Sequence, residues 1–393
     1  MTQPDTPRVS YAELARLFIR LSLVAFGGPV AHVAMAEDEL VARRKWLTRE
    51  HYLDLIAATN LIPGPNSTEV MIHVGYTLRG IPGAILTGSC FILPTFFLTL
   101  ALAVLYVQTG AIPAVEALLW GIKPVIVAII ANAGYRLVPT ALKSRLLWLT
   151  CAATAGAILL LHVPEVVAII GAGVIYAVIE TRVSVPLVMA LVASPSGLLQ
   201  QSIDFGMRAG VSDVFFYFLK IGSVLFGTGY VLIVYIQQDL VNTFGWLSGR
   251  ELLDAIAIGQ ITPGPVSTTA TVVGYIVAGL PGAFAATLGI FLPCFVLVIL
   301  TAPLIPKMRR SRFMSAFLNG VNAGVIAAIL ITVVGLAGEA LQPLDGAVVT
   351  SYVAIGLAIT ALVALIRFRI NATWLIMISA LVGLAMPILA FSH

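Results

Sequence analysis

Long apolar segments dominate this sequence and determine the kind of fold that it can adopt. A helix of about 20 apolar residues crosses a bilayer core. Only 10% of the 393 residues are charged and 60% are hydrophobic, whereas soluble domains are about 25% charged. The runs are too long for the alternating strands of a membrane β-barrel. We therefore predict an all-α polytopic membrane protein, with spans at 12–36, 82–108, 114–138, 145–161, 163–182, 213–238, 281–304, 314–338, 346–366 and 373–391.

The chain also contains an internal repeat. Phe26-Gly27 recurs as Phe226-Gly227, and the Pro-Gly-Pro triplet at 63–65 recurs at 263–265, so matching positions differ by 263 − 63 = 200. Such a repeat indicates two structurally similar halves. We predict an N-terminal repeat at 1–182, a linker at 183–211 and a C-terminal repeat at 212–393, with about five transmembrane helices and one broken re-entrant hairpin in each half.

The broken hairpins are predicted at 51–79 and 251–278. Each segment is interrupted in its centre by Pro-Gly-Pro. The pieces on either side are about 13 residues long, or about 20 Å as helix, which is too short to cross a bilayer. A single kinked transmembrane helix is the alternative.

Charged loops predict that the two halves are inverted. Arg43, Arg44 and Lys45 follow the first span, whereas the matching loop at 243–249 carries no basic residue. The bias is reversed in another pair of loops, because 307–312 is basic and its counterpart at 108–113 is neutral. Positive loops stay in the cytoplasm, so opposite charge in matching loops is typical of inverted repeats. This topology predicts both termini outside.

The two hairpin tips are the candidate binding site for an anion. Proline ends the first half-helix, and glycine permits the chain to reverse. The next half-helix then points free N–H groups and a positive dipole end at the membrane centre, where an oxyanion can bind. Simple helix capping is the alternative. The candidate residues are Asn60, Pro63, Gly64, Pro65, Asn66, Ser67 and Thr68 in the first half, and Gln260, Pro263, Gly264, Pro265, Ser267 and Thr268 in the second.

Several charged residues fall within apolar segments. Arg20 and Lys220 occupy the same repeat position, and intramembrane cations usually mark a substrate or ion path, so both join the substrate-binding set; snorkelling to the interface is the alternative. Glu69, Asp54 and Asp254 are candidates for proton coupling. Each also has a structural alternative, as a capping-box residue for Glu69 and as a cap or loop ion-pair partner for the two aspartates. For Lys123, a functional role and snorkelling to the interface both stay open.

Other classes of function lack sequence support. The cysteines are scattered and the histidines show no ligand spacing, so we predict neither a metal site nor a disulfide framework. The scattered basic residues do not predict nucleic-acid binding. Since there is no nucleotide, haem or flavin motif, we expect no cofactor and no enzyme activity, and any pumping must use an ion gradient.

The motifs resemble those of the chromate ion transporter family, in its long two-half form. The resemblance covers nearly the whole chain and rests on FGGPVAHVAM, DLIAATNLIPGPNSTEV and WLSGRELLDAIAIGQITPGPVSTTATVVGY. It implies a multi-pass protein of the bacterial inner membrane that exports chromate with proton coupling and confers chromate resistance. The expected partners are chromate or sulfate, protons and the lipid bilayer; a homodimer is left open.

Three further readings stay open beside chromate export. One is a carrier for sulfate or another oxyanion, since chromate and sulfate are both tetrahedral dianions. The others are a membrane-embedded chromate reductase, for which the sequence offers no cofactor motif, and a membrane subunit without transport activity.

Overall fold

The computed structural model describes residues 9–26, 28–109, 112–182, 209–226, 229–303, 311–343 and 348–390, and within these ranges the chain forms helices and no strand. The first half contains α1 (Tyr11–Val24), α2 (Gly28–Glu37), the π-helix η1 (Asp38–Arg43), α3 (Arg49–Thr59), α4 (Asn66–Thr109), α5 (Pro113–Ala141), α6 (Arg145–Leu161) and α7 (Glu165–Thr181). The second half contains α10 (Val211–Val224), α11 (Val231–Ile236), the π-helix η2 (Gln237–Thr243), α12 (Gly249–Ile261), the 3₁₀ turn η3 (Val266–Thr268), α13 (Thr269–Thr301), α15 (Arg312–Ala340), α16 (Val348–Arg367) and α17 (Ala372–Ala390). The same succession of elements thus occurs twice.

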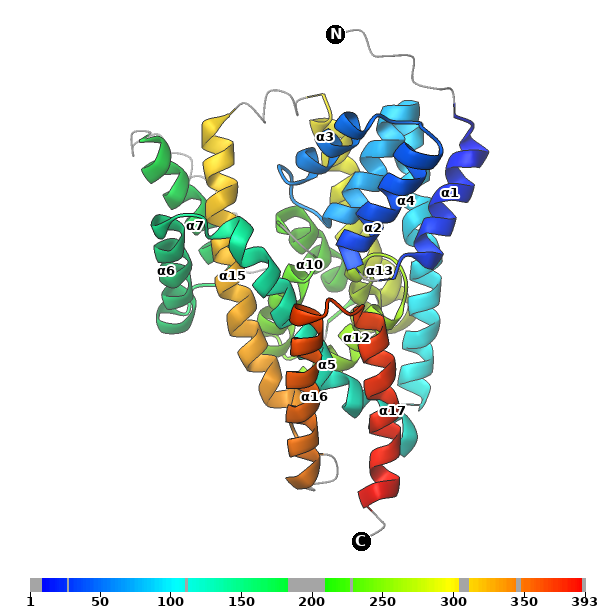
Figure 1. Ribbon diagram of the computed structural model, residues 1–393, viewed down its shortest axis with the longest axis vertical. Helices are drawn as coiled ribbons and strands as arrows, with labels where there is room; N and C mark the ends of the chain where they lie inside the picture. The colour runs from blue at the N-terminus through cyan, green and yellow to red at the C-terminus, as the bar shows by residue number, and fades with distance from the viewer. Residues whose placement is uncertain are drawn as a thin grey trace.

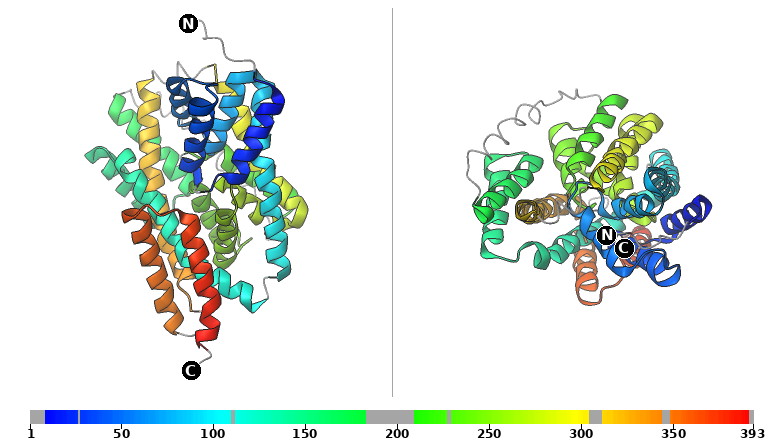
Figure 2. Two further views of the ribbon diagram at one scale, coloured as in Figure 1. Left: turned by 45° about the vertical axis from the view of Figure 1, so that its right-hand side comes forward. Right: turned by 90° about the horizontal axis from the view of Figure 1, so that it is seen from above.

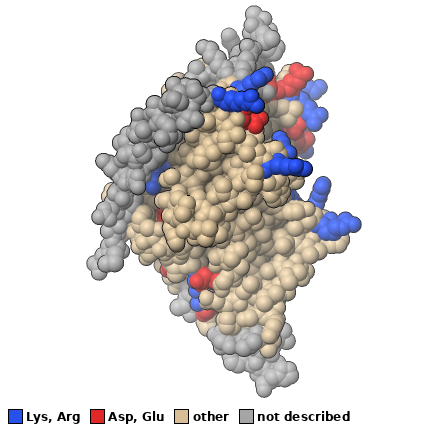
Figure 3. Space-filling model, turned by 90° about the vertical axis from the view of Figure 1, so that its left-hand side faces the viewer, with Lys and Arg blue, Asp and Glu red and all other residues tan. Residues whose placement is uncertain are grey.

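The polytopic membrane fold predicted from composition is confirmed in its broad form. Five helices within the described ranges are long and apolar enough to cross a membrane: α4, α5, η3 with α13, α15 and most of α16. Large apolar side chains on these and neighbouring helices are exposed, as with Leu160 at 77% and Val334 at 75%, which suits contact with lipid tails. Figure 3 shows one face on which most charged side chains lie in the upper part and along one edge, while the broad area below is uncharged except for one small patch.

The first predicted span of each half is wrong as a single helix. In place of one helix over 12–36, α1 ends at Val24 and α2 begins at Gly28; in place of 213–238, α10 ends at Val224 and α11 begins at Val231. Figure 1 shows α1 and α2 running in opposite directions on either side of this break. The continuous apolar run concealed the break, because apolar residues lie on both sides of it.

The interruptions predicted at the Pro-Gly-Pro triplets are confirmed. Helix α3 ends at Thr59 and α4 begins at Asn66, while α12 ends at Ile261 and the 3₁₀ turn begins at Val266. The re-entrant placement of these hairpins in a bilayer stays a prediction.

A sharp kink separates each hairpin from the long helix that follows. Gly80 has φ 63° and ψ −152°, and Gly279 has φ 62° and ψ −155°. Glycine adopts this conformation without the steric cost that a side chain would impose. Pro82 and Pro281 follow two residues later, where a proline suits the first turn of a new helix. The chain therefore reverses at the boundary predicted between 79 and 82.

The two halves interlock through paired helices. Helix α17 packs on α5, and α7 packs on α15. A Cβ added to Gly121 would meet the backbone of Gly383 on α17, and one added to Gly320 would meet Gly173 on α7. Small residues let membrane helices approach this closely, so glycines bring the helices of the two halves together at both places.

The ends of the described chain lie at opposite ends of the molecule. Figure 1 and the left view of Figure 2 show the start of α1 at the top and the end of α17 at the bottom, with α6 and α7 in the upper part and α16 and α17 in the lower part. The prediction that both termini share one side is therefore wrong. That prediction treated α1 and α2 together as one helix that crosses the membrane, and α10 and α11 together as another. The predicted linker falls largely outside the described residues, as does most of the basic loop at 307–312.

Candidate functional site

Each hairpin tip is hydrogen-bonded to the break in the first helix of the other half. The amide of Gly64 donates to the carbonyl oxygen of Leu225 over 2.6 Å, and the amide of Gly264 donates to that of Ala25 over 3.1 Å. Ala25 and Leu225 are the C-cap residues that directly follow α1 and α10. A break in a buried apolar helix leaves carbonyls without partners. The opposite tip supplies these partners, so the two tips and the two breaks form one reciprocal unit.

The glycine of each tip leaves no room for a side chain. Gly64 and Gly264 have φ values of 148° and 92°, which disfavour other residues. A Cβ on Gly264 would collide with Thr95 of α4, and a Cβ on Gly64 would lie 3.1 Å from the sulfur of Cys294 on α13. Thr95 and Cys294 are matching repeat positions (294 − 95 = 199). The long helices α4 and α13 therefore support the opposite tips in equivalent ways.

Buried polar atoms without a partner concentrate at the tips. Within the described part of the chain, no hydrogen bond is made by Thr68 Oγ1, by either carboxyl oxygen of Glu69, by Gln260 Nε2 or by Ser267 Oγ. Thr68, Glu69 and Ser267 are at most 1% exposed. Leaving such atoms unpaired costs free energy, and functional sites are where proteins tolerate that cost. The tips thus offer unused donors: two hydroxyls, one amide and the first N–H groups of α4 and η3.

A small cavity adjoins the second tip. Its volume is about 20 Å³, which accommodates about one water molecule and is too small for a tetrahedral oxyanion. Its polar lining includes the side chains of Tyr230, Gln260 and Thr262. This conformation therefore holds the second tip closed.

The other predicted tip residues divide between buried and partly exposed positions. Asn60 is exposed and accepts a 2.9 Å hydrogen bond from Asn66 Nδ2. Thr268 is buried, and its hydroxyl donates to the carbonyl oxygen of Pro265 over 2.8 Å, which is a capping contact. The remaining members vary in burial: Gly64, Pro65, Ser67, Pro263, Gly264 and Pro265 are buried, whereas Pro63 and Gln260 are half-buried.

The structure shows no capping box for Glu69. Its carboxyl oxygens accept no hydrogen bond from any described group, although Glu69 lies three residues after Asn66. The structural alternative for this residue is therefore wrong. Asp54 is exposed on α3 and interacts with other residues, whereas Asp254 is 3% exposed on α12. The two repeat-equivalent aspartates thus occupy different environments.

Arg20 and Lys220 pair with matching carboxylates rather than with the tips. Arg20 Nη1 lies 3.8 Å from Glu39 Oε1, and Lys220 interacts electrostatically with Asp239. The Arg20 side chain is 63% exposed. It lines a wide pocket between α1, α2 and η1 to which no described tip residue contributes. The sequence analysis missed both carboxylates, although Glu39 and Asp239 recur at the offset of 200 and signal the pairing.

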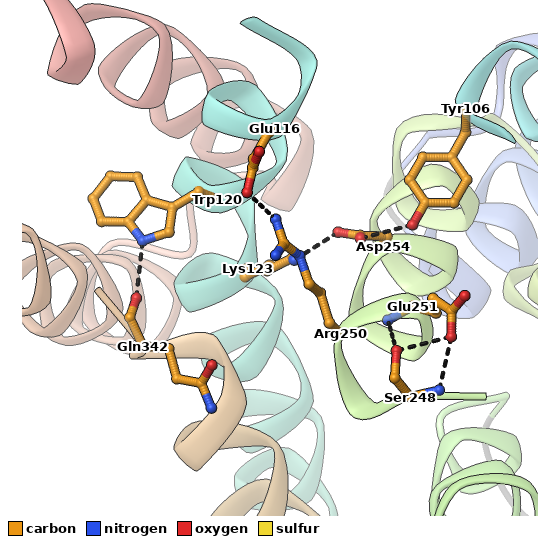
Figure 4. Close-up of polar contacts among 9 residues, drawn as sticks. All are labelled: Tyr106, Glu116, Trp120, Lys123, Ser248, Arg250, Glu251, Asp254 and Gln342. Atoms are coloured by element: carbon orange, nitrogen blue, oxygen red, sulfur yellow. Dashed lines mark hydrogen bonds and ion pairs between the residues drawn. The ribbon is translucent and has the colours of Figure 1, made fainter. Parts of the chain in front are cut away.

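Lys123 belongs to a buried polar cluster that joins the two halves. Its Nζ lies 3.0 Å from Asp254 Oδ1, and the Tyr106 hydroxyl donates to Asp254 Oδ2 over 2.9 Å. Nearer the surface, Arg250 pairs with Glu116. Figure 4 shows Lys123 and Glu116 on α5 facing Arg250 and Asp254 on α12, with Tyr106 on the far side of Asp254. Snorkelling is therefore wrong for Lys123. The sequence contained no signal for this pairing, because the partners come from three distant helices.

Comparison with known proteins matches this chain over both halves. A family model described as chromate transporter matches residues 12–177 and 212–384. The chain is 30% identical to the chromate transport protein of Cupriavidus metallidurans, over 98% of this chain and 95% of the relative. It is 33% identical to the chromate transport protein of Pseudomonas aeruginosa, over 86% of this chain and 83% of the relative. No solved structure matches the chain.

The family model and these relatives extend across the helices that form the tips, the breaks and the buried cluster. The relatives are named as transport proteins, so the resemblance seen in the motifs is confirmed. The family consists of transporters and not of enzymes. The chain therefore belongs to the chromate transporter family.

Proposed function

We propose that this protein is a secondary transporter that exports chromate across the bacterial inner membrane and thereby confers chromate resistance. The family match and the two relatives named chromate transport proteins support the substrate. The observation that carries the proposal is the concentration of unpaired buried polar atoms at the two tips.

The tips provide the kind of chemistry that a tetrahedral dianion requires. Thr68 and Ser267 can donate through their hydroxyls, and Gln260 through its side-chain amide. The first N–H groups of the half-helices that begin at Asn66 and Val266 add donors with the favourable end of the helix dipole. We propose that chromate binds among these groups once the closed second tip has opened. The backbone at Pro63, Pro65, Pro263 and Pro265 shapes this site.

We propose that Arg20 and Lys220 attract the anion on its way to the tips. Each cation has a carboxylate partner, and Arg20 is largely exposed in a wide pocket. Exposed charges steer ions more than they hold them. We therefore infer that the two residues act where the anion approaches the binding site.

The membrane potential favours export of a dianion. Moving one charge through 100 mV is worth about 2.3 kcal/mol, so two charges gain about 4.6 kcal/mol per 100 mV when they leave an inside-negative cell. We propose that the proton gradient adds to this force. Glu69, whose carboxyl has no hydrogen-bond partner among the described residues, is the leading proton-coupling candidate, ahead of Asp54 and Asp254.

We propose that the two halves are inverted repeats that rock to alternate access. The repeated order of elements and the position of α6 and α7 opposite α16 and α17 support this arrangement (Figure 1). The reciprocal bonds of Gly64 and Gly264 would then be remade in each half-cycle.

Transport into inside-out vesicles tests the proposal. Purified protein is reconstituted, and uptake of radiolabelled chromate is followed with an imposed membrane potential, with a pH gradient and with neither. We expect uptake that both gradients stimulate. Absence of uptake by folded protein would contradict the proposal, and stronger transport of sulfate in the same vesicles would assign the protein to the sulfate carriers.

A further inference from the structure

The buried Lys123–Asp254 pair lies between α5 and α12, and α12 leads to the second tip. Along α12, Arg250 is at the exposed end, Asp254 follows one turn later, and Gln260 lies six residues further, about 9 Å along the helix. Gln260 lines the cavity at the tip. Glu116 and Lys123 on α5 face Arg250 and Asp254 on α12 (Figure 4).

The lysine of this ion pair occurs in one half of the repeat and not in the other. Gly121-Ile122-Lys123 on α5 matches Gly320-Val321-Asn322 on α15, so an uncharged residue stands at the lysine position in the second half. Asp254 has the equivalent Asp54, which is exposed. The charged pair therefore belongs to the contact of α5 with α12 and has no charged counterpart at the matching position of α15.

The two oxygens of Asp254 have separate partners. Oδ1 lies 3.0 Å from the Lys123 ammonium, and Oδ2 accepts the hydrogen bond of Tyr106 over 2.9 Å. Asp254 therefore keeps one partner when Lys123 turns to another anion. The lysine and aspartate side chains are only 8% and 4% exposed, so the ammonium must always have a negative partner at this depth.

We propose that Lys123 is an oxyanion-binding residue of the transport path, and that Asp254 occupies the place of the oxyanion in this closed conformation. A lysine ammonium is a compact charge with three donors, and it binds tetrahedral oxyanions as a point charge. The arriving dianion replaces Asp254 as the ion-pair partner of Lys123, and the Asp254 carboxylate stays hydrogen-bonded to Tyr106. The exchange also loosens the contact between α5 of one half and α12 of the other. This inference rests on the proposed oxyanion transport.

Binding of sulfate to the purified full-length protein in detergent tests the inference. Sulfate is a non-oxidising tetrahedral dianion, and its affinity is measured by isothermal titration. Asp254→Asn removes the competitor, so we expect sulfate to bind about tenfold more tightly. Lys123→Gln removes the donor, and we expect binding about tenfold weaker than in the wild type. Unchanged affinity in both variants would overturn the inference.

A second variant covers the case in which Asp254→Asn does not fold because its lysine has lost the counter-ion. Tyr106→Phe keeps the ion pair but leaves a displaced Asp254 without a partner, so sulfate should bind about fivefold more weakly. A merely structural ion pair predicts no change in affinity for Tyr106→Phe, and that result would overturn the inference.

The matched control is Glu50→Gln, which removes one negative charge at the position of α3 equivalent to Arg250, and its affinity should equal that of the wild type. A change as large as that of Asp254→Asn would show a general charge effect and overturn the inference. If the wild-type protein transports chromate in vesicles and the variants bind sulfate with the same affinity as the wild type, only this inference fails. If neither the wild type nor Asp254→Asn binds sulfate or chromate, the proposed function fails with it.

Discussion

The amide of Gly64 in the first hairpin tip donates a 2.6 Å hydrogen bond to the carbonyl oxygen of Leu225, where α10 breaks in the other half. Gly264 makes the equivalent bond to Ala25. Each tip therefore satisfies a backbone carbonyl that a helix break has exposed in an apolar interior, where an unpaired carbonyl is costly. Movement of the first tip requires a new partner for the Leu225 carbonyl, whereas the Ala25 carbonyl also lies 3.0 Å from His32 Nε2. The tips and breaks are therefore coupled through these bonds.

A side chain at Gly264 should prevent this coupling. In Gly264→Ala, the added Cβ collides with Thr95, and the φ of 92° disfavours alanine. We expect a loss of stability of about 1–3 kcal/mol and loss of chromate transport. Thermal unfolding in detergent and vesicle uptake measure the two effects. The control is Gly156→Ala on α6, where an added Cβ meets nothing within 4 Å; equal losses in both variants would argue against a specific role for the tip.

The unpaired hydroxyl of Ser267 should affect affinity more than stability. Because Ser267 Oγ makes no hydrogen bond with the described protein, Ser267→Ala removes no internal bond and should leave the unfolding midpoint nearly unchanged. If this hydroxyl donates to the oxyanion, Kd for chromate should rise about tenfold. Isothermal titration and thermal unfolding of the same preparations provide the two readouts.

Thr269→Val is the contrasting variant for that experiment. The Thr269 hydroxyl donates to the carbonyl oxygen of Val266 over 2.8 Å, so its loss should cost about 1 kcal/mol of stability with little change in Kd. A Ser267→Ala protein that is less stable but binds chromate normally would assign Ser267 to the fold.

The sequence predicts features that single residues impose locally. Pro63 and Gly80 interrupt helices through their own backbone properties, and the structure breaks at those places. The break at Ala25 was missed because the apolar run continues across it, although Gly28, with φ 77°, and Pro29 follow it. Pairing of Lys123 with Asp254 was missed because the two residues lie on helices far apart in the sequence. Contacts between distant segments arise from packing, which one sequence alone does not reveal.

Glu69 should be required for coupling and not for folding. Its carboxyl has no partner among the described residues and is fully buried, so Glu69→Gln removes a group whose burial is unfavourable. We expect an equal or higher unfolding midpoint. In vesicles, a pH gradient should no longer stimulate chromate uptake, whereas an imposed membrane potential should still do so. Persistent stimulation by the pH gradient would exclude Glu69 as the coupling carboxyl.

Arg20 and Lys220 should influence capture of the anion in a salt-dependent way. Arg20 is 63% exposed beside Glu39, and exposed charges act over about 10 Å at 0.1 M salt and much less at higher salt. We expect Arg20→Gln and Lys220→Gln each to raise KM for chromate about threefold at low ionic strength, with kcat unchanged. The difference from wild type should shrink as salt is added, because screening removes the steering that the wild type has. Uptake kinetics over a salt series measure this. A rise in KM that is independent of salt would instead indicate direct contact with the bound oxyanion, and an unchanged KM in both variants would remove these residues from the transport path.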